Sequence, residues 1–149
     1  MNGKKVVCSV VAGGIVYLIF STALSIIAQA IAPFSWADVG GMRAMNDPWM
    51  IGYFFYGFVL LIGAAILYQI VNLKGTVAEK GIKFGALMWL VTNIPSAFII
   101  LTTMIYPLGF FLQNVLFGYI IWLFVGTTIA CMSECRGECC RFKAKKKRK

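Results

Sequence analysis

Cysteine provides the most reactive side chains of this sequence, and four of its five cysteines gather near the C-terminus. They are Cys131, Cys135, Cys139 and Cys140. On a continuing helix the first three share one face, where thiolates suit zinc, copper(I) or an iron–sulfur centre. However, the spacing matches none of the usual C-x-x-C patterns, and a reducing cytosol disfavours structural disulfides. Cysteines between a membrane and a basic run also suit S-palmitoylation in eukaryotes. Three interpretations therefore stay open: metal or redox chemistry, acylation, and no specific role.

Histidine is absent from the sequence, which narrows the available chemistry further. Without imidazole there is no His-ligated haem, zinc or copper site and no catalytic triad or dyad built on histidine. The acidic residues all lie outside the long apolar runs, so no carboxylate is embedded in them. They are Asp38, Asp47, Glu79, Glu134 and Glu138. We therefore expect a protein that is not an enzyme and that uses no cofactor.

Asn93 is a strongly polar residue inside the third apolar run, two residues before Pro95. Because Pro95 lacks an N–H and crowds the preceding turn, we expect a kink in this helix. Interrupted helices near the bilayer midplane are where transporters place substrate sites, so Asn93 and Ser96 could line a ligand cavity between the first and third helices. Ser21 and Ser25 would supply the other wall. The alternative is structural, because asparagine in a span commonly joins helices by hydrogen bonds worth about 0.6–2 kcal/mol.

Glycines recur at helical spacing in the third and fourth apolar runs. Gly81 and Gly85 form a small-xxx-small pair, and Gly118 and Gly126 repeat the idea further along the chain. Such pairs allow two helix backbones to approach closely. We expect these glycines to pack helices within one chain, with a contact between two copies as the alternative.

The net charge of +9 belongs mainly to the C-terminal tail, since eight of the fourteen Lys and Arg residues lie between Arg136 and Lys149. A run this basic repels itself and is held near anionic headgroups at about 1 kcal/mol per cation. We therefore expect anionic lipid rather than nucleic acid as its partner. The expected headgroup contacts are Arg141, Lys143, Lys145, Lys146, Lys147, Arg148 and Lys149.

The elements that must position these residues are membrane helices. The sequence is 60% hydrophobic and 13% charged, against about 25% charged in soluble domains. Four apolar runs, free of Asp, Glu, Lys and Arg except for Lys83 at the start of the third, are long enough to cross about 30 Å of hydrocarbon: 6–32, 49–73, 82–106 and 108–132. The first run is too long for a signal peptide. We predict an all-α, polytopic, antiparallel four-helix transmembrane domain over 1–133, followed by a basic tail over 134–149.

Lysine and arginine positions predict the orientation of these helices. Lys4 and Lys5 precede the first run, Lys74 and Lys80 lie between the second and third runs with Lys83 just inside the third, and the tail follows the fourth. The other side carries Arg43 alone. Positive loops stay in the cytoplasm, so both termini are expected inside the cell. We expect an integral protein of a prokaryotic cytoplasmic membrane, with a eukaryotic endomembrane as the alternative.

The connections between the runs contain ordinary start and stop signals. Asp47 and Pro48 suit the N-cap and first position of the second helix, and Gly75 suits its end. Thr76 and Glu79 have capping-box spacing, which would start the third helix before the hydrocarbon boundary. The loop 33–47 is long enough for a short interfacial helix. Aromatic residues suited to the outer membrane surface are Trp36, Trp49 and Tyr106.

One motif in the third run carries a resemblance. It reads Gly81-x-x-x-Gly85-x-x-x-Trp89-Leu90-x-x-Asn93-x-Pro95. With the charged hairpin before it and a glycine-containing helix after it, this segment resembles families of small four-span prokaryotic membrane proteins without assigned function. The resemblance covers most of helices 2 to 4 and implies architecture without lending catalytic or binding residues. The chain is also similar in size to small multidrug transporters, but it lacks the embedded carboxylate that such proteins use for proton coupling.

These observations favour a protein that acts through helix packing, as an accessory or assembly subunit of a membrane complex or as a homo-oligomer. A small carrier or a protein that binds lipid or another hydrophobic ligand between helices 1 and 3 is the alternative.

Overall fold

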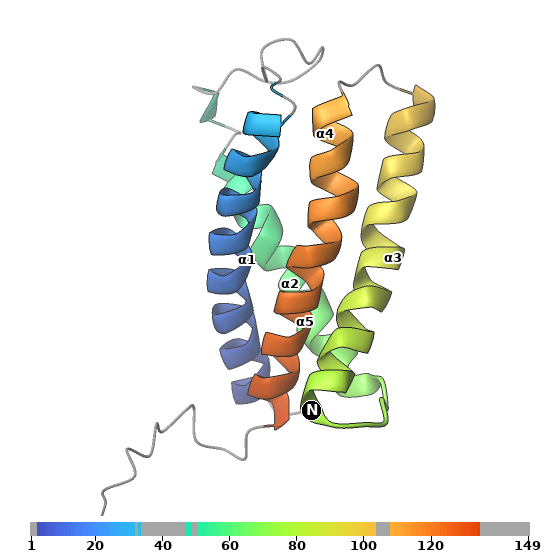
Figure 1. The fold of residues 1–149 in the computed structure, drawn as a ribbon. Helices are drawn as coiled ribbons and strands as arrows, with labels where there is room; N and C mark the ends of the chain where they lie inside the picture. Colours follow the sequence, from blue (N-terminus) through green and yellow to red (C-terminus); the bar gives the residue numbers. More distant parts are fainter. Residues whose placement is uncertain (1–2, 32, 34–46, 49–50, 104–107, 135–149) are drawn as a thin grey trace, which may run out of the picture.

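The computed structural model describes residues 3–31, 33, 47–48, 51–103 and 108–134, and this described part is helical apart from short connections (Figure 1). Its elements are α1 (Gly3–Ile31), α2 (Ile51–Ile70), α3 (Val77–Thr103), α4 (Leu108–Leu112), the π-helical turn η3 (Gln113–Phe117) and α5 (Gly118–Glu134). The last three follow one another without a break and form one rod. The expected all-α class is therefore confirmed, with four helical rods in the described residues.

Three of the four rods are long and apolar enough to cross a membrane by length and composition: Gly3–Ile31, Val77–Thr102 and Gly109–Glu134. The remaining rod, α2, has 20 residues and a shorter apolar segment, Phe55–Ile70. Twenty residues rise about 30 Å, which matches the hydrocarbon thickness when the helix is not strongly tilted. The membrane class expected from composition is supported to this extent.

The connection between α2 and α3 confirms one boundary signal and corrects another. Thr76 N donates to Glu79 Oε2 at 3.1 Å and Glu79 N donates to Thr76 Oγ1 at 3.4 Å, so the predicted capping box starts α3 at Val77. Gly75 does not end α2, because that helix already stops at Ile70. Gly75 instead has a φ of 129°, a left-handed conformation open to glycine, in the turn that leads into the capping box.

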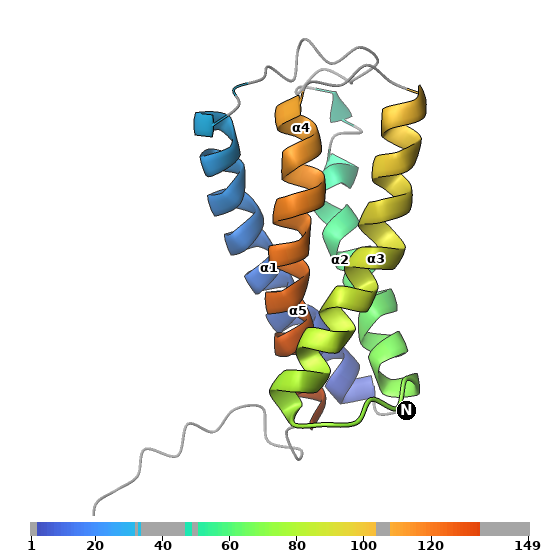
Figure 2. The same ribbon diagram turned by 45° about the vertical axis from the view of Figure 1, so that its right-hand side comes forward.

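Helix α5 lies between α1 and α3 and packs against both, as the two views in Figure 1 and Figure 2 show. Its most extensive interface is with α3 and the next is with α1. Helix α2 lies behind this layer and packs chiefly on α1. Because α5 lies at the centre, it has more buried residues than any other described helix.

The contact between α3 and α5 depends on three glycines. A Cβ added to Gly81 would collide with Thr127 Cα, and one added to Gly85 would collide with Trp122 O. On the opposing helix, a Cβ on Gly126 would lie 2.7 Å from Gly85 N. The two backbones therefore touch directly, as small residues permit in membrane helix pairs.

Large side chains fill the space on either side of this backbone contact. Phe84, Leu61, Ile129 and Val125 are fully buried in one cluster. Trp122 joins the same cluster, which draws on α2, α3 and α5. The outward faces of all the rods carry exposed aliphatic residues. Examples are Val11, Ile19, Ile26, Val59, Ile70, Leu90, Val91, Leu101 and Leu116.

Several sequence expectations fall outside the described residues. These are the interfacial helix in the 33–47 loop, the aromatic residues Trp36, Trp49 and Tyr106, the cysteines Cys135, Cys139 and Cys140, and the basic tail. Asp47 and Pro48 are described, and Pro48 lies in a 3₁₀ turn shortly before α2 begins at Ile51.

Replacing Gly85 by alanine is expected to destabilise the protein, because the new methyl group must push α3 away from the Trp122 carbonyl. Overpacking of this kind costs about 1–3 kcal/mol. Gly63→Ala on α2 is the matched control, since a Cβ there meets nothing within 4 Å. The control is expected to unfold at the same temperature as the parent or slightly above it, because alanine favours helix by about 0.5–1 kcal/mol. Thermal unfolding in detergent, followed by circular dichroism, measures both; equal melting temperatures for the two variants would contradict the contact.

Candidate functional site

The described polar residues form two groups, one within the helices around Asn93 and one at the end of the bundle around Glu134. Asn93 bridges α3 and the fourth rod. Its Nδ2 donates to Asn114 O at 2.7 Å, and its Oδ1 accepts from Trp122 Nε1 at 2.9 Å. Thr92 Oγ1 lies 2.9 Å from the same oxygen and 2.7 Å from Met88 O. Asn93 is thus hydrogen-bonded on both its donor and its acceptor side.

The π-helical turn η3 supplies the main-chain acceptor of Asn93. A π turn interrupts the regular ladder of main-chain bonds, and side chains of α3 bond to two of its carbonyls. Besides the bond from Asn93 to Asn114 O, Trp89 Nε1 donates to Val115 O at 2.8 Å. The Trp89 ring also stacks edge to face on Tyr119, with 5.1 Å between ring centroids. The π turn is therefore held from α3 by two side chains one helical turn apart.

Gly118 makes room for the Asn93 group, since a Cβ there would collide with Asn93 Nδ2. The four glycines expected to pack helices thus divide between two tasks. Gly81, Gly85 and Gly126 lie at the backbone contact between α3 and α5, whereas Gly118 faces a hydrogen-bonding side chain.

The structure does not gather the four residues proposed to line a cavity between helices 1 and 3. Helix α5 lies between α1 and α3. Ser21 Oγ donates to Leu18 O in its own helix at 3.2 Å, and Ser96 Oγ donates to Thr92 O in its own helix at 2.8 Å. Asn93 bonds to the π turn and to α5. Ser25 is half-buried on α1 and shares no described hydrogen bond with these three.

Pro95 lies inside α3, which continues to Thr103. Since proline has no N–H, the carbonyl of Val91 loses its usual partner four residues on. The hydroxyls of Thr92 and Ser96 bond to carbonyls on either side of that gap, at Met88 O and Thr92 O. The kink expected here stays a prediction.

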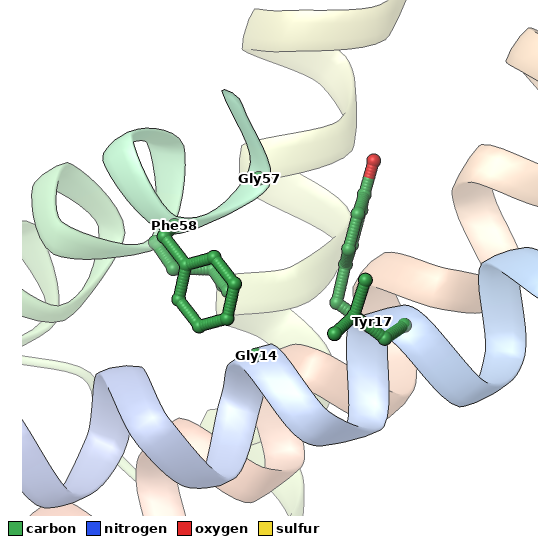
Figure 3. A pocket seen from close by; sticks show the side chains of 6 residues that line it. Gly14, Tyr17, Gly57 and Phe58 are labelled. Atoms are coloured by element: carbon green, nitrogen blue, oxygen red, sulfur yellow. The ribbon is translucent and has the colours of Figure 1, made fainter. Parts of the chain in front are cut away.

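A shallow apolar pocket lies between α1 and α2 (Figure 3). Two rings lie over two glycines at its sides: a Cβ on Gly57 would lie 2.9 Å from Tyr17 Cε1, and one on Gly14 would lie 2.6 Å from Phe58 Cε1. The pocket volume is about 10 Å³, near the smallest space that admits one water molecule. This geometry suits ring-over-glycine packing of the two helices and leaves no room for a ligand of drug size.

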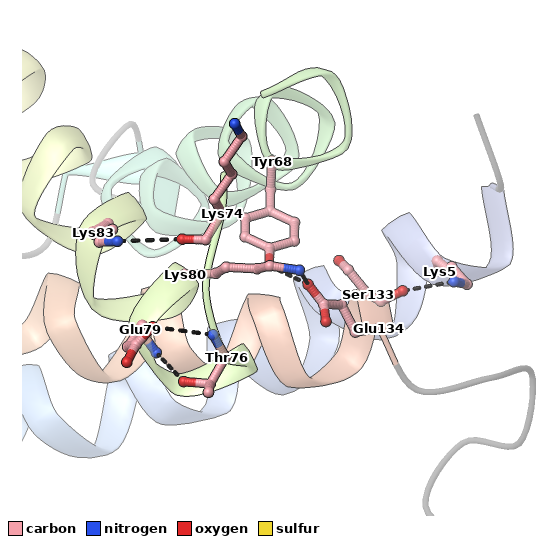
Figure 4. A network of polar contacts seen from close by, with 9 residues as sticks. All are labelled: Lys5, Tyr68, Lys74, Thr76, Glu79, Lys80, Lys83, Ser133 and Glu134. Carbon is pink, nitrogen blue, oxygen red and sulfur yellow. Dashed lines mark hydrogen bonds and ion pairs between the residues drawn. The ribbon is translucent and has the colours of Figure 1, made fainter. Parts of the chain in front are cut away.

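The second polar group lies at the end of the bundle where α5 stops (Figure 4). Glu134 Oε1 accepts from Lys80 Nζ of α3 at 2.8 Å and from Tyr68 OH of α2 at 3.1 Å. Lys80 and Glu134 are both partly exposed, so their ion pair is screened by solvent. Tyr68 also stacks edge to face on Phe84, which ties the hydrogen bond to the buried cluster.

The preceding residue, Ser133, joins α1 to the same end. Lys5 Nζ donates to Ser133 O at 2.6 Å, where a cation satisfies one of the last carbonyls of α5. Ser9 Oγ and Ser133 Oγ lie 3.2 Å apart, and these residues are 0% and 7% exposed. Two consecutive residues of α5 therefore contact all three other rods through polar bonds.

Two of the cysteines are described, and both are free thiols: Cys8 is half-buried and Cys131 is exposed. Within the described ranges, no three residues of metal-ligating type come together. The three interpretations of the C-terminal cysteines depend on residues after Glu134 and stay open.

Sequence reasoning found Asn93 but missed most of its partners. Trp122, Asn114 and the π turn were not singled out, and Trp89 was noted only as part of a motif. Ser9, Ser133 and Tyr68 of the second polar group were not singled out either. A signal existed for the first group, because Gln113 and Asn114 are adjacent amides in an otherwise apolar run.

Asn93→Leu is expected to destabilise the bundle, because it leaves Asn114 O and Trp122 Nε1 without their partner. Measured hydrogen bonds between membrane helices suggest a loss of about 0.6–2 kcal/mol. Ser96→Ala, three residues away on an exposed face, is the control and is expected to change stability by less than about 0.5 kcal/mol. Unfolding of each variant in detergent gives the comparison. If Asn93→Leu unfolds like the parent, the hydrogen bonds of Asn93 do not hold α3 to the fourth rod.

Comparison of the chain with protein-family models, with curated proteins and with solved structures finds no match. The resemblance of helices 2 to 4 to small four-span membrane proteins therefore stays an expectation about architecture.

Proposed function

We propose that this chain is a non-enzymatic integral membrane protein that acts through helix packing, as an accessory or assembly subunit of a membrane complex or as a homo-oligomer. One observation carries the proposal: large aliphatic side chains are exposed on every rod, whereas the glycines that bring α3 and α5 together face inward. Water would disfavour such an exterior, and lipid or another membrane protein would accept it.

The proposed topology is an antiparallel four-span bundle with both termini in the cytoplasm. The bond from Lys5 to Ser133 places the start of α1 beside the end of α5. The connection between α2 and α3 reaches the same end, since Tyr68 and Lys80 both bond to Glu134. Lysines gather there, and the positive-inside rule favours that end as the cytoplasmic one. The described lysines are Lys4, Lys5, Lys74, Lys80 and Lys83.

Cysteine labelling checks this topology. In a background with the native cysteines changed to serine, Asp47→Cys is expected to react with a membrane-impermeant maleimide applied to intact cells. Lys74→Cys, at the other end of α2, is expected to react only after the membrane is permeabilised. Labelling of both positions from the same side would rule out the proposed orientation. Release of the protein from membranes by alkaline carbonate would rule out membrane insertion.

A packing role fits the two polar groups better than a transport role does. Asn93 bonds to main chain and to Trp122, and the pocket between α1 and α2 is of water size. The acidic residues of the described helices, Glu79 and Glu134, lie at helix ends. A carrier needs a polar site that is open to substrate near the midplane. Here the polar side chains of Ser21 and Ser96 bond to carbonyls of their own helices, and Asn93 bonds across to the fourth rod.

Purification in mild detergent tests the role itself. We expect a species larger than one chain in mild detergent, either a homo-oligomer or a complex with a co-purifying protein, because the outward aliphatic faces are available for helix contacts. Light scattering with detergent correction gives the protein mass, and mass spectrometry identifies a partner. The same sample in a harsh detergent serves as the dissociated reference. A stable, well-folded monomer with nothing bound would count decisively against an assembly role.

A further inference from the structure

Two lysines form an exposed basic corner where α2 is joined to α3. Lys83 Nζ donates to Lys74 O at 3.2 Å, so the Lys83 ammonium lies beside residue 74 (Figure 4). The Lys74 side chain is exposed. We call Lys74 and Lys83 the basic corner.

The two lysines of the basic corner differ from Lys5 and Lys80 in the groups that their ammoniums face. Lys80 bonds to the Glu134 carboxylate, and Lys5 bonds to a carbonyl at the end of α5. Lys83 uses one of its three donors on a neutral carbonyl, and the Lys74 ammonium makes no described bond. Two positive charges in one exposed corner, with no carboxylate bonded to either among the described residues, are complementary to an anion.

An apolar stripe leads away from this corner along α3. Leu87, Val91, Ile94 and Phe98 follow Lys83 at four-, eight-, eleven- and fifteen-residue spacing, which keeps them on one face of a helix. They are 42%, 60%, 38% and 68% exposed. From Lys83 to Phe98 the helix rises about 22 Å, more than half of the roughly 30 Å hydrocarbon core. We call these four residues the apolar stripe.

From this juxtaposition we infer that the protein binds an anionic phospholipid, with its phosphate at the basic corner and an acyl chain along the apolar stripe. The inference rests on the proposed membrane insertion and adds the class of lipid that the inserted protein binds. Lysine ammoniums are compact charges that bind phosphate, and their aliphatic stems reach to the headgroup level from a helix end. A soluble anion would use the corner but not the stripe, whereas a phospholipid uses both.

Lipid binding by the purified full-length protein tests this site. Native mass spectrometry in mild detergent, titrated with phosphatidylglycerol or phosphatidylcholine, gives the preference for the anionic lipid in the first bound molecule. Lys74→Gln with Lys83→Gln is expected to lower that preference about thirtyfold, from about 1 kcal/mol per cation near a phosphate. Lys74→Arg with Lys83→Arg keeps both charges and is expected to retain most of it.

Two tail lysines supply the control of equal charge loss. Lys146→Gln with Lys147→Gln is expected to leave the preference of the first bound lipid within about twofold of the parent, because loss of two of several tail cations weakens diffuse attraction only. Circular dichroism and the melting temperature check that each variant is folded. Excess inorganic phosphate is the third probe and is expected not to displace the lipid.

An unchanged preference in the folded glutamine double variant would overturn the inference, as would an equal loss in the tail variant or displacement by inorganic phosphate. A glutamine double variant that fails to fold is replaced by the two single variants, each expected to lose about fivefold. Carbonate extraction of membranes separates this failure from that of the proposed function. A chain that stays in the membrane but shows no lipid preference contradicts only the lipid site.

Discussion

The direct contact between the backbones of α3 and α5 is the constraint on which the rest of the structure depends. Gly81, Gly85 and Gly126 leave no space for a Cβ between the two helices. In lipid, burial of apolar surface does not drive helices together, so close van der Waals contact and hydrogen bonds must do so. This contact fixes the rotation and height of α5 against α3. The Asn93 and Glu134 groups both rely on that register.

Polar bonds above and below the glycine contact then hold a single arrangement. Asn93 and Trp89 bond to carbonyls of the π turn, and Glu134 bonds to Lys80 and Tyr68. A π turn accommodates one extra residue without disturbing the helix on either side of it. The bonds that a polar side chain makes inside the bundle thereby specify register more than they add stability.

The proposed role follows from what this arrangement leaves on the outside. The interior holds glycines, aromatic rings and a few aliphatic side chains such as Leu61, Val125 and Ile129, and many more aliphatic residues are exposed on the exterior. That exterior is suited to acyl chains and to other membrane helices. The cationic end adds a second, electrostatic preference, since Lys74 and Lys83 lie where lipid headgroups would be. The proposed packing role, orientation and lipid contact would all be consequences of one division between interior and surface.

The sequence by itself determined the helical class, the approximate extent of the four apolar rods and the capping box at Thr76 and Glu79, because these depend on local composition and on neighbours three to four residues apart. It also singled out Gly81, Gly85, Gly118 and Gly126 for close helix packing, and Asn93 as a residue that lines a ligand cavity or joins two helices. Only the tertiary structure decided that α5 separates α1 from α3, that Asn93 bonds to Asn114 and Trp122, and that Ser9 meets Ser133. These contacts join residues far apart in the chain. The periodicity of a helix shows which residues share a face. Which helix packs on that face depends on how closely the two backbones can approach.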